Sequence, residues 1–344
     1  KLSIFAPKFV FDHVIRQLYE LINYKDDENP LMQIFIKKIS SLGINEDQVN
    51  NLVSELSAVI KSDVKPGFKL ILDYMEENYA SSNVNHGVWS LPNGNEFYAL
   101  RLRSYTTTNY TAEEIHQIGL NEVARIGNRM KEIFLELGYE VNKPIGKMMN
   151  ELNENPEFLY EDTPDRKEIV IKDYNKMVKE AEEDVRPYFD KFPKSPVEVR
   201  AVPEYSEKTA AGGYYQAPSL DGSRPGVFYA NLYDIKQTPK FGMRTLTFHE
   251  AVPGHHFQIA LNQENEDLTL YRKLGYRTSA YTEGWALYSE TLPKEIGLYK
   301  DPYSDFGRLS GELWRACRLV VDTGIHHYRW TREEGIDYYM NNTA

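Results

Sequence analysis

The sequence lacks the features of disulfide-linked, nucleic-acid-binding and membrane-spanning proteins. It contains one cysteine, Cys317, so no disulfide can form within the chain. Acidic residues outnumber basic ones by 51 to 40, and the net charge of -11 argues against nucleic acid or an anionic membrane as a partner. No run approaches the roughly 20 apolar residues of a membrane helix, so we expect no transmembrane segment in this chain. The oligomeric state stays open.

The two ends of the sequence suggest a fragment. The chain begins at Lys1 and shows no signal peptide. Near the other end, Thr331 and Glu334 form the pattern of a capping box, yet the chain stops at Ala344, soon after the helix would begin. We therefore expect truncation at both ends.

Most of the sequence has the apolar spacing of helices. Four helical segments are expected between residues 9 and 80, with Asn45 as the N-cap of the third and Pro66 in the first turn of the fourth. Thr111 and Glu114 form a capping box that begins a further long helix. These segments predict a helical scaffold.

The pattern changes after a long charged helix over residues 167–186. Residues 197–202, 213–217 and 227–232 are short runs that alternate in polarity or are rich in aromatic and β-branched residues, as strands are. We expect a small antiparallel sheet over about 197–232. An edge strand could bind an extended peptide by strand addition, or the sheet could simply cover the helices.

These elements together predict a mainly α fold with a small antiparallel sheet. We expect an N-terminal helical part over residues 1–110 and a catalytic part over 111–344 that carries the sheet and the metal-binding helices. With 344 residues, the chain is long enough for more than one domain. We nevertheless expect the two parts to form one continuous helical unit.

The stretch HEAVPGHHFQ, which begins at His249, contains three of the eight histidines. Imidazoles near a carboxylate are typical of a zinc site with its own general base, and Glu250 directly follows the first histidine. His255 and His256 lie six and seven residues after His249, so neither can share a metal with it on a regular helix. Pro253 and Gly254 indicate a break that could bring His255 back.

Two carboxylates follow in the stretch TEGWALYSE. Glu283 and Glu290 are seven residues apart and share one helical face with Leu287. Carboxylates on an apolar face are costly unless they are paired or bind a metal. We predict Glu283 as the third metal ligand and Glu290 as a hydrogen-bond partner of a ligand histidine. For the second ligand we favour His255 over His256.

A third polar stripe lies on a helical run near the end of the chain. His326 could donate a hydrogen bond to a developing oxyanion, and Asp322, four residues earlier, could orient it. Arg315 or Arg318 could bind a substrate carboxylate in bidentate fashion, although ordinary helical ion pairs would explain both arginines. Cys317 falls on the apolar face and is read as a core residue.

The motifs HEAVPGHHFQ, TEGWALYSE and DTGIHHYRW, with DGSRPGVFYANL and YTAEEIHQIGLNEVARI before them, resemble a bacterial family called domain of unknown function 885. The resemblance covers roughly residues 86–340. It implies a largely helical architecture of the gluzincin (peptidase MA) type with a small sheet beside a cleft. It also implies zinc held by His249, His255 and Glu283, with Glu250 as base.

The resemblance further implies that Tyr229 and His326 line the cleft, and we count Arg224, of the DGSRPG loop, as another substrate-binding candidate. Members of this family are often exported or lipid-anchored, so a location outside the cytoplasm is expected. The hypothesis is a zinc metallopeptidase that acts on a peptide or small amide, in a carboxypeptidase mode if an arginine faces the cleft. A zinc hydrolase of non-peptide amides or esters, and a non-catalytic binding relative, remain alternatives.

Overall fold

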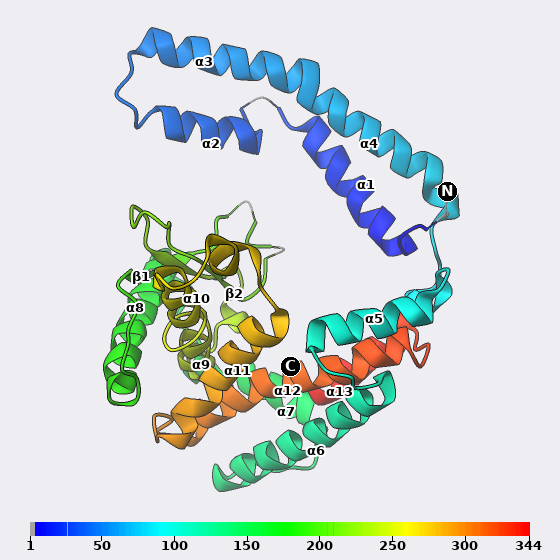
Figure 1. Cartoon of the computed structure of the whole chain (residues 1–344), viewed down its shortest axis with the longest axis vertical. Helices are drawn as coiled ribbons and strands as arrows, with labels where there is room; N and C mark the ends of the chain where they lie inside the picture. Colours follow the sequence, from blue (N-terminus) through cyan, green and yellow to red (C-terminus); the bar gives the residue numbers. More distant parts are fainter. Residues whose placement is uncertain (1–3, 26, 205, 209) are drawn as a thin grey trace. The chain divides into compact units, whose positions relative to one another are not determined.

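The computed structural model describes residues 4–25, 27–204, 206–208 and 210–344 (Figure 1). The chain divides into two compact units, Lys1–Pro92 and Asn93–Ala344. Helix α5 (Gly94–Thr106) belongs to the second unit. Both units are mainly helical, as predicted.

The first unit contains the four expected helices. They are α1 (Lys8–Asn23), α2 (Pro30–Ile39), α3 (Glu46–Val59) and α4 (Lys65–Asn78). Asn45 caps α3 in a reciprocal capping box with Gln48, which confirms the predicted N-cap. No loop separates α3 from α4, because a π-helical turn, η1 (Ile60–Val64), joins them. Pro66 cannot donate a hydrogen bond to the preceding turn, and this wider turn accommodates it.

The second unit contains the remaining helices and the sheet. Its α-helices after α5 are α6 (Ala112–Glu136), α7 (Ile145–Asn153), α8 (Arg166–Val185), α9 (Lys240–Glu250), α10 (His255–Glu264), α11 (Ser279–Glu295), α12 (Pro302–His326) and α13 (Arg332–Asn342). The capping boxes predicted at Thr111 and Thr331 are both present. Among the described helices, none is both long enough and apolar enough to cross a membrane.

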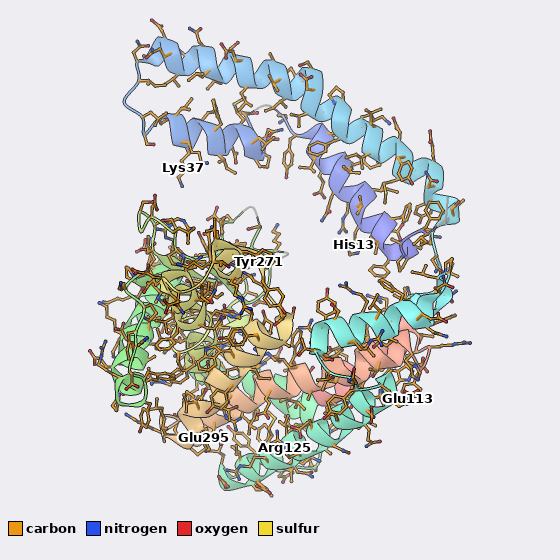
Figure 2. All side chains as sticks on the ribbon, viewed as in Figure 1. His13, Lys37, Glu113, Arg125, Tyr271 and Glu295 are labelled. Atoms are coloured by element: carbon orange, nitrogen blue, oxygen red, sulfur yellow. The ribbon has the colours of Figure 1, made fainter. Side chains whose placement is uncertain are left out.

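The two longest helices, α6 and α12, pack closely along their apolar faces. Ile126, Met130 and Cys317 are almost fully buried in the core between them, which confirms Cys317 as a core residue. A Cβ atom placed on Gly119 of α6 would lie only 2.8 Å from side-chain atoms of α12. Arg125 of α6, labelled in Figure 2, also forms an ion pair with Glu312 of α12. This helix pair supports the residues that α12 contributes to the site.

The small sheet has three strands in the order β1-β3-β2. They are β1 (Val197–Ala201), β2 (Gly213–Gln216) and β3 (Gly226–Ala230). The prediction of an antiparallel sheet is wrong in part, because β1 pairs with β3 in parallel and only β2 is antiparallel to β3. Strand β3 follows β2 in the sequence, but it lies between β1 and β2 in the sheet.

One face of the sheet packs on α8 and α9. Phe228 of β3 meets Tyr174 of α8 edge to face, with ring centroids 5.1 Å apart, and Met243 of α9 lies in the same cluster. Burial of such aromatic and aliphatic side chains is the main force that fixes these elements to one another. It also fixes the C-terminal end of α9, where His249 and Glu250 lie.

Candidate metal centre

A tight turn separates the two histidine-bearing helices. Helix α9 ends at Glu250 and α10 begins at His255, so the chain breaks where Pro253 and Gly254 predicted it. A Cβ atom on Gly254 would lie 1.9 Å from the carbonyl oxygen of His249. Only glycine therefore lets the backbone fold back this closely.

Helix α11 holds this turn in place. The indole nitrogen of Trp285 donates a 2.7 Å hydrogen bond to the carbonyl oxygen of Pro253, and the Ser289 hydroxyl donates one of 3.2 Å to the same oxygen. Both residues belong to the TEGWALYSE stretch, which also contains Glu283. The turn and the predicted third ligand are thus coupled through one helix.

The three predicted ligands converge. Nε2 of His249 and Nε2 of His255 lie 3.9 and 3.8 Å from Oε2 of Glu283. One candidate ligand atom from each residue lies within 4.8 Å of the other two. Both histidines are buried, whereas the Glu283 side chain is 63% exposed and faces the solvent side of the site. The spacing His-x5-His therefore produces the cluster that a regular helix could not.

This cluster fits a zinc ion by its chemistry and its dimensions. Two imidazoles and one carboxylate are a donor set that zinc uses in catalytic sites, and tetrahedral coordination separates donor atoms by about 3.3 Å. The distances to Glu283 exceed that by only about half an ångström. The Nδ1 atom of His255 is buried without a hydrogen-bond partner among the described residues. Burial, with a smaller contribution from the Arg315 cation, lowers the pKa of His255 to about 3, so this ring stays neutral, as a ligand must be.

Glu250 lies beside the cluster and is only 5% exposed. Burial raises the pKa of its carboxyl group to about 7. Its Oε2 atom is buried and accepts no hydrogen bond within the described part of the chain. A buried carboxyl oxygen without a partner is costly in a purely structural role, and it is what a proton-accepting group beside a metal would require.

Glu290 lies at the Nδ1 side of the His249 ring. Oε1 of Glu290 lies 2.7 Å from Nδ1 of His249, and the carboxylate is almost completely buried. Arg315 approaches both oxygens of the same carboxylate, at 2.8 and 3.2 Å. With Nδ1 bonded to a carboxylate, Nε2 is left for a metal, which is the usual arrangement of ligand histidines. Arg315, considered above for substrate binding, is thus engaged with Glu290.

His256 has a different role from its neighbour. Its Nδ1 atom lies 2.9 Å from the hydroxyl of Tyr215, and its Nε2 atom lies 3.0 Å from the carbonyl oxygen of Ser195. Both ring nitrogens are therefore occupied, and the ring ties α10 to the sheet. Between the two histidines that the sequence offered as the second ligand, the geometry favours His255.

A cavity of about 590 Å³ contains His249, Glu250, His255 and Glu283, and we call it the metal cavity. Sequence reasoning missed several of its lining residues, among them Tyr174, Tyr214, Tyr215, Arg277 and Trp314. The sequence contains one pattern that could have identified Arg277 as a candidate site residue. Arg277 ends the segment YRKLGYR, which has three cations and no acidic residue.

The remaining substrate-binding candidates lie in different places. Arg318 lines the metal cavity and lies over the ring of Trp314, 4.9 Å from its centroid. Tyr229 stacks on Tyr214, and Arg224 bonds within its own loop to the carbonyl of Pro225. Neither Tyr229 nor Arg224 is among the described residues that line the metal cavity.

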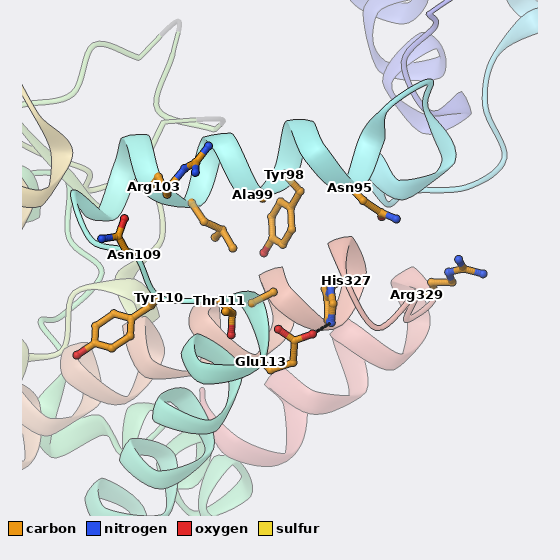
Figure 3. A pocket seen from close by; sticks show the side chains of 12 residues that line it. Asn95, Tyr98, Ala99, Arg103, Asn109, Tyr110, Thr111, Glu113, His327 and Arg329 are labelled. Atoms are coloured by element: carbon orange, nitrogen blue, oxygen red, sulfur yellow. Dashed lines mark ion pairs between the residues drawn. The ribbon is translucent and has the colours of Figure 1, made fainter.

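Asp322 and His326 lie further along α12, away from the metal donors. His326 follows Arg315 by eleven residues, or roughly 16 Å along the helix axis. Asp322 accepts a 2.6 Å hydrogen bond from Tyr98, whose ring packs against His326. Tyr98 lines a separate cavity of about 500 Å³, drawn in Figure 3, where Glu113 forms an ion pair with His327. Asp322 and His326 therefore lie beside α5 and not at the metal cavity.

Comparisons with known proteins agree with the sequence resemblance at the level of the family. The chain belongs to the family described as bacterial protein of unknown function (DUF885), whose profile matches residues 1–344. No curated protein matches it.

Solved structures similar to this one include two bacterial proteins. A crystal structure of a proposed lipoprotein from Colwellia psychrerythraea is 38% identical, with a TM-score of 0.94 over 98% of this chain and 58% of that one. A proposed lipoprotein of unknown function from Shewanella oneidensis, 17% identical with a TM-score of 0.67, shares the fold over 98% of this chain and 60% of its own. The chain thus spans somewhat more than half the length of these relatives.

Proposed function

We propose that this protein is a zinc-dependent hydrolase that cleaves peptide amide bonds. His249, His255 and Glu283 would hold the metal, and Glu250 would act as the general base. The observation that carries the proposal is the convergence of three donor atoms within 4.8 Å beside a buried carboxyl group that has no partner among the described residues. A protein that only binds a ligand has no need of that carboxyl group.

The chemistry divides between the metal and the side chains. When bound, zinc supplies Lewis-acid activation of water and of the amide carbonyl. Glu250 accepts a proton at its carboxylate and delivers it to the leaving amine. Glu290 and Arg315 keep the His249 ring in one orientation, so its Nε2 atom stays directed at the site. The metal cavity gives room for a short stretch of peptide.

The gluzincin type of architecture and a location outside the cytoplasm belong to the same proposal. The order of the histidine, glutamate and TEGWALYSE motifs along the chain supports the former. The similar structures described as proposed lipoproteins support the latter. Activity of the whole protein is part of the proposal too, because this chain spans only part of the length of those relatives.

Metal analysis and two variants test this function. We expect about one zinc per chain in protein purified without chelator, and its loss in His249→Ala. Glu250→Gln is the matched variant: it should keep the zinc and lose about 10²- to 10⁴-fold in kcat on peptides. Zinc bound equally well by His249→Ala would refute the ligand assignment. Turnover that survives Glu250→Gln would refute the mechanism, and cleavage of small esters without peptides would change the substrate class.

A further inference from the structure

A second, smaller cavity adjoins the metal cavity, and its charge is unusual for this protein. It has a volume of about 240 Å³, and three cations line it: Arg272, Lys273 and Arg277. We call it the basic cavity. Its described lining residues include no aspartate or glutamate, although the chain as a whole carries a net charge of -11. Arg272 and Arg277 are exposed, so water solvates their charges and both guanidinium groups are accessible to an anionic ligand.

The three cations have no carboxylate partner within the described part of the chain. Elsewhere on the protein, arginines such as Arg125, Arg244 and Arg308 are paired with glutamate or aspartate. The guanidinium groups of Arg272 and Arg277 therefore keep donors for a ligand. Planar guanidinium groups bind carboxylates through paired, charge-assisted hydrogen bonds.

The local fold holds this cationic segment against the site. The π-helical turn η7 (Tyr271–Gly275) carries Arg272 and Lys273, and Tyr271 of this turn is labelled in Figure 2. The side-chain amide of Asn262 on α10 reaches the carbonyl oxygens of Arg272 and Lys273, at 3.4 and 3.5 Å. Thr278 then caps α11 through a hydrogen bond from the backbone of Tyr281. The cations thus lie between α10 and α11, the helices that carry His255 and Glu283.

The basic cavity opens beside the proposed metal ligands. Ile259, Arg277 and Thr282 line both cavities, and Thr282 directly precedes Glu283. Gln258 also lines the basic cavity, and its side-chain oxygen is buried without a hydrogen-bond partner among the described residues. Because an amide can rotate to exchange its oxygen and nitrogen, Gln258 can present N–H donors to a bound anion.

Because the two cavities share lining residues, we infer that the basic cavity binds a carboxylate of the substrate. The peptide bond to be cleaved, close to that carboxylate, then lies at the proposed metal ligands. The inference rests on the proposed function and narrows its substrate class to peptides with a negative charge near the cleaved bond. The volume admits one terminal group or one side chain and is too small for a whole ligand. Arg315 is unsuited to this role because it holds Glu290.

Three peptides of equal length and otherwise neutral sequence test the inference. One has a free C-terminal carboxylate, one is amidated, and one is amidated but carries a single glutamate. Hydrolysis is measured with zinc-loaded protein, and binding is measured calorimetrically with zinc-loaded Glu250→Gln. We expect at least a tenfold preference for a charged peptide over the neutral one, the size that a hydrogen bond to a charged group supports. The preferred charged peptide identifies the source of the carboxylate.

The variants Arg277→Gln and Arg272→Gln should remove most of this preference, with KM raised and kcat little changed. Arg332→Gln on α13, which lies outside both cavities, removes the same charge and should keep the preference.

Equal binding of all three peptides, or an unchanged preference in both variants, would overturn the inference. Selective binding that depends on Arg277, without hydrolysis by the zinc-loaded wild type, would sustain the basic cavity and overturn the peptidase function.

Discussion

Gly254 is the residue on which the approach of the two histidines depends most directly. Any side chain there meets the carbonyl oxygens of Phe248 and His249, at 2.3 and 1.9 Å. Because these are backbone atoms, the turn itself must open. We expect Gly254→Ala to bind zinc at least tenfold more weakly and to melt at a lower temperature. Gly242→Ala is the control, since a Cβ on this helical glycine meets its nearest atom at 3.9 Å. Full zinc content in Gly254→Ala would disprove the role of the turn.

Arg315 would act on a bound metal through two other residues. It neutralises Glu290, which is almost completely buried and holds Nδ1 of His249. Without the arginine, the carboxylate is a buried charge without its cation, and the orientation of the ring is less well fixed. We predict a 10- to 100-fold loss of zinc affinity in Arg315→Gln, measured by competition with a chelator. Arg318→Gln, one turn further along α12, should keep the wild-type zinc affinity.

Cys317 is the sole cysteine and is completely buried, so its thiol reports unfolding. Burial raises the pKa of this thiol to about 12, from an ordinary value of about 8.5. The folded state therefore keeps the proton longer than the unfolded state, and the stability that this contributes is lost as the pH rises from about 8.5 towards 12.

We expect a thiol reagent at pH 8 to label the folded protein orders of magnitude more slowly than the unfolded protein. The free energy of unfolding should fall more steeply above pH 8.5 in the wild type than in Cys317→Ala. Rapid labelling under native conditions would contradict the packing of α12 against α6.

At the scale of elements, two glycines of α6 should respond in opposite ways to the same substitution. A Cβ on Gly119 would lie 2.8 Å from atoms of Leu319 and Val320, whereas a Cβ on Gly127 has no heavy atom within 4 Å. Alanine in a helix interior is favoured over glycine by about 1 kcal/mol. At Gly119 the overpacking cost of about 1–3 kcal/mol exceeds that gain.

Gly127→Ala should therefore stabilise the protein and Gly119→Ala should destabilise it, as measured by denaturant unfolding. Destabilisation of similar size in both variants would point to a general intolerance of α6 to substitution, and would contradict a specific contact with α12.

The helices and strands followed from the sequence because their signals are local. Caps at Asn45, Thr111 and Thr331 and the break at Gly254 depend on neighbouring residues, and the structure contains them where they were predicted. The order and direction of the strands depend on partners distant in the sequence, and antiparallel pairing was the wrong expectation for β1.

The same limit applies to the site. Helical periodicity placed Glu283 and Glu290 on one helical face and made Asp322 and His326 neighbours. It could not predict which residues along α12 line the metal cavity. The structure brings Arg315 and Arg318 to that cavity and leaves Asp322 bonded to Tyr98. Cavity residues such as Tyr215 and Arg277 come from separate elements, and their approach is set by tertiary packing that no local pattern encodes.

At the scale of the whole molecule, the two units differ in how much of their helical surface is buried. Helix α3 of the first unit has no buried residue, whereas α12 of the second has buried residues along most of its length. The four hydrophobic clusters of the described residues, and all the proposed metal ligands, lie in the second unit. Segments with little burial open at lower free energy than the core of a domain.

We therefore predict that hydrogen exchange in the intact chain separates the two units. Amides of α3 should exchange orders of magnitude faster than the central amides of α6 and α12. Zinc should slow exchange in α9, α10 and α11 and leave α3 unchanged, because a ligand stabilises the unit that binds it. His249→Ala is the control, in which zinc should protect none of these helices. Equal protection of α3 and α12 without metal would mean that the chain unfolds as one cooperative body, and the difference in burial would then not govern its stability.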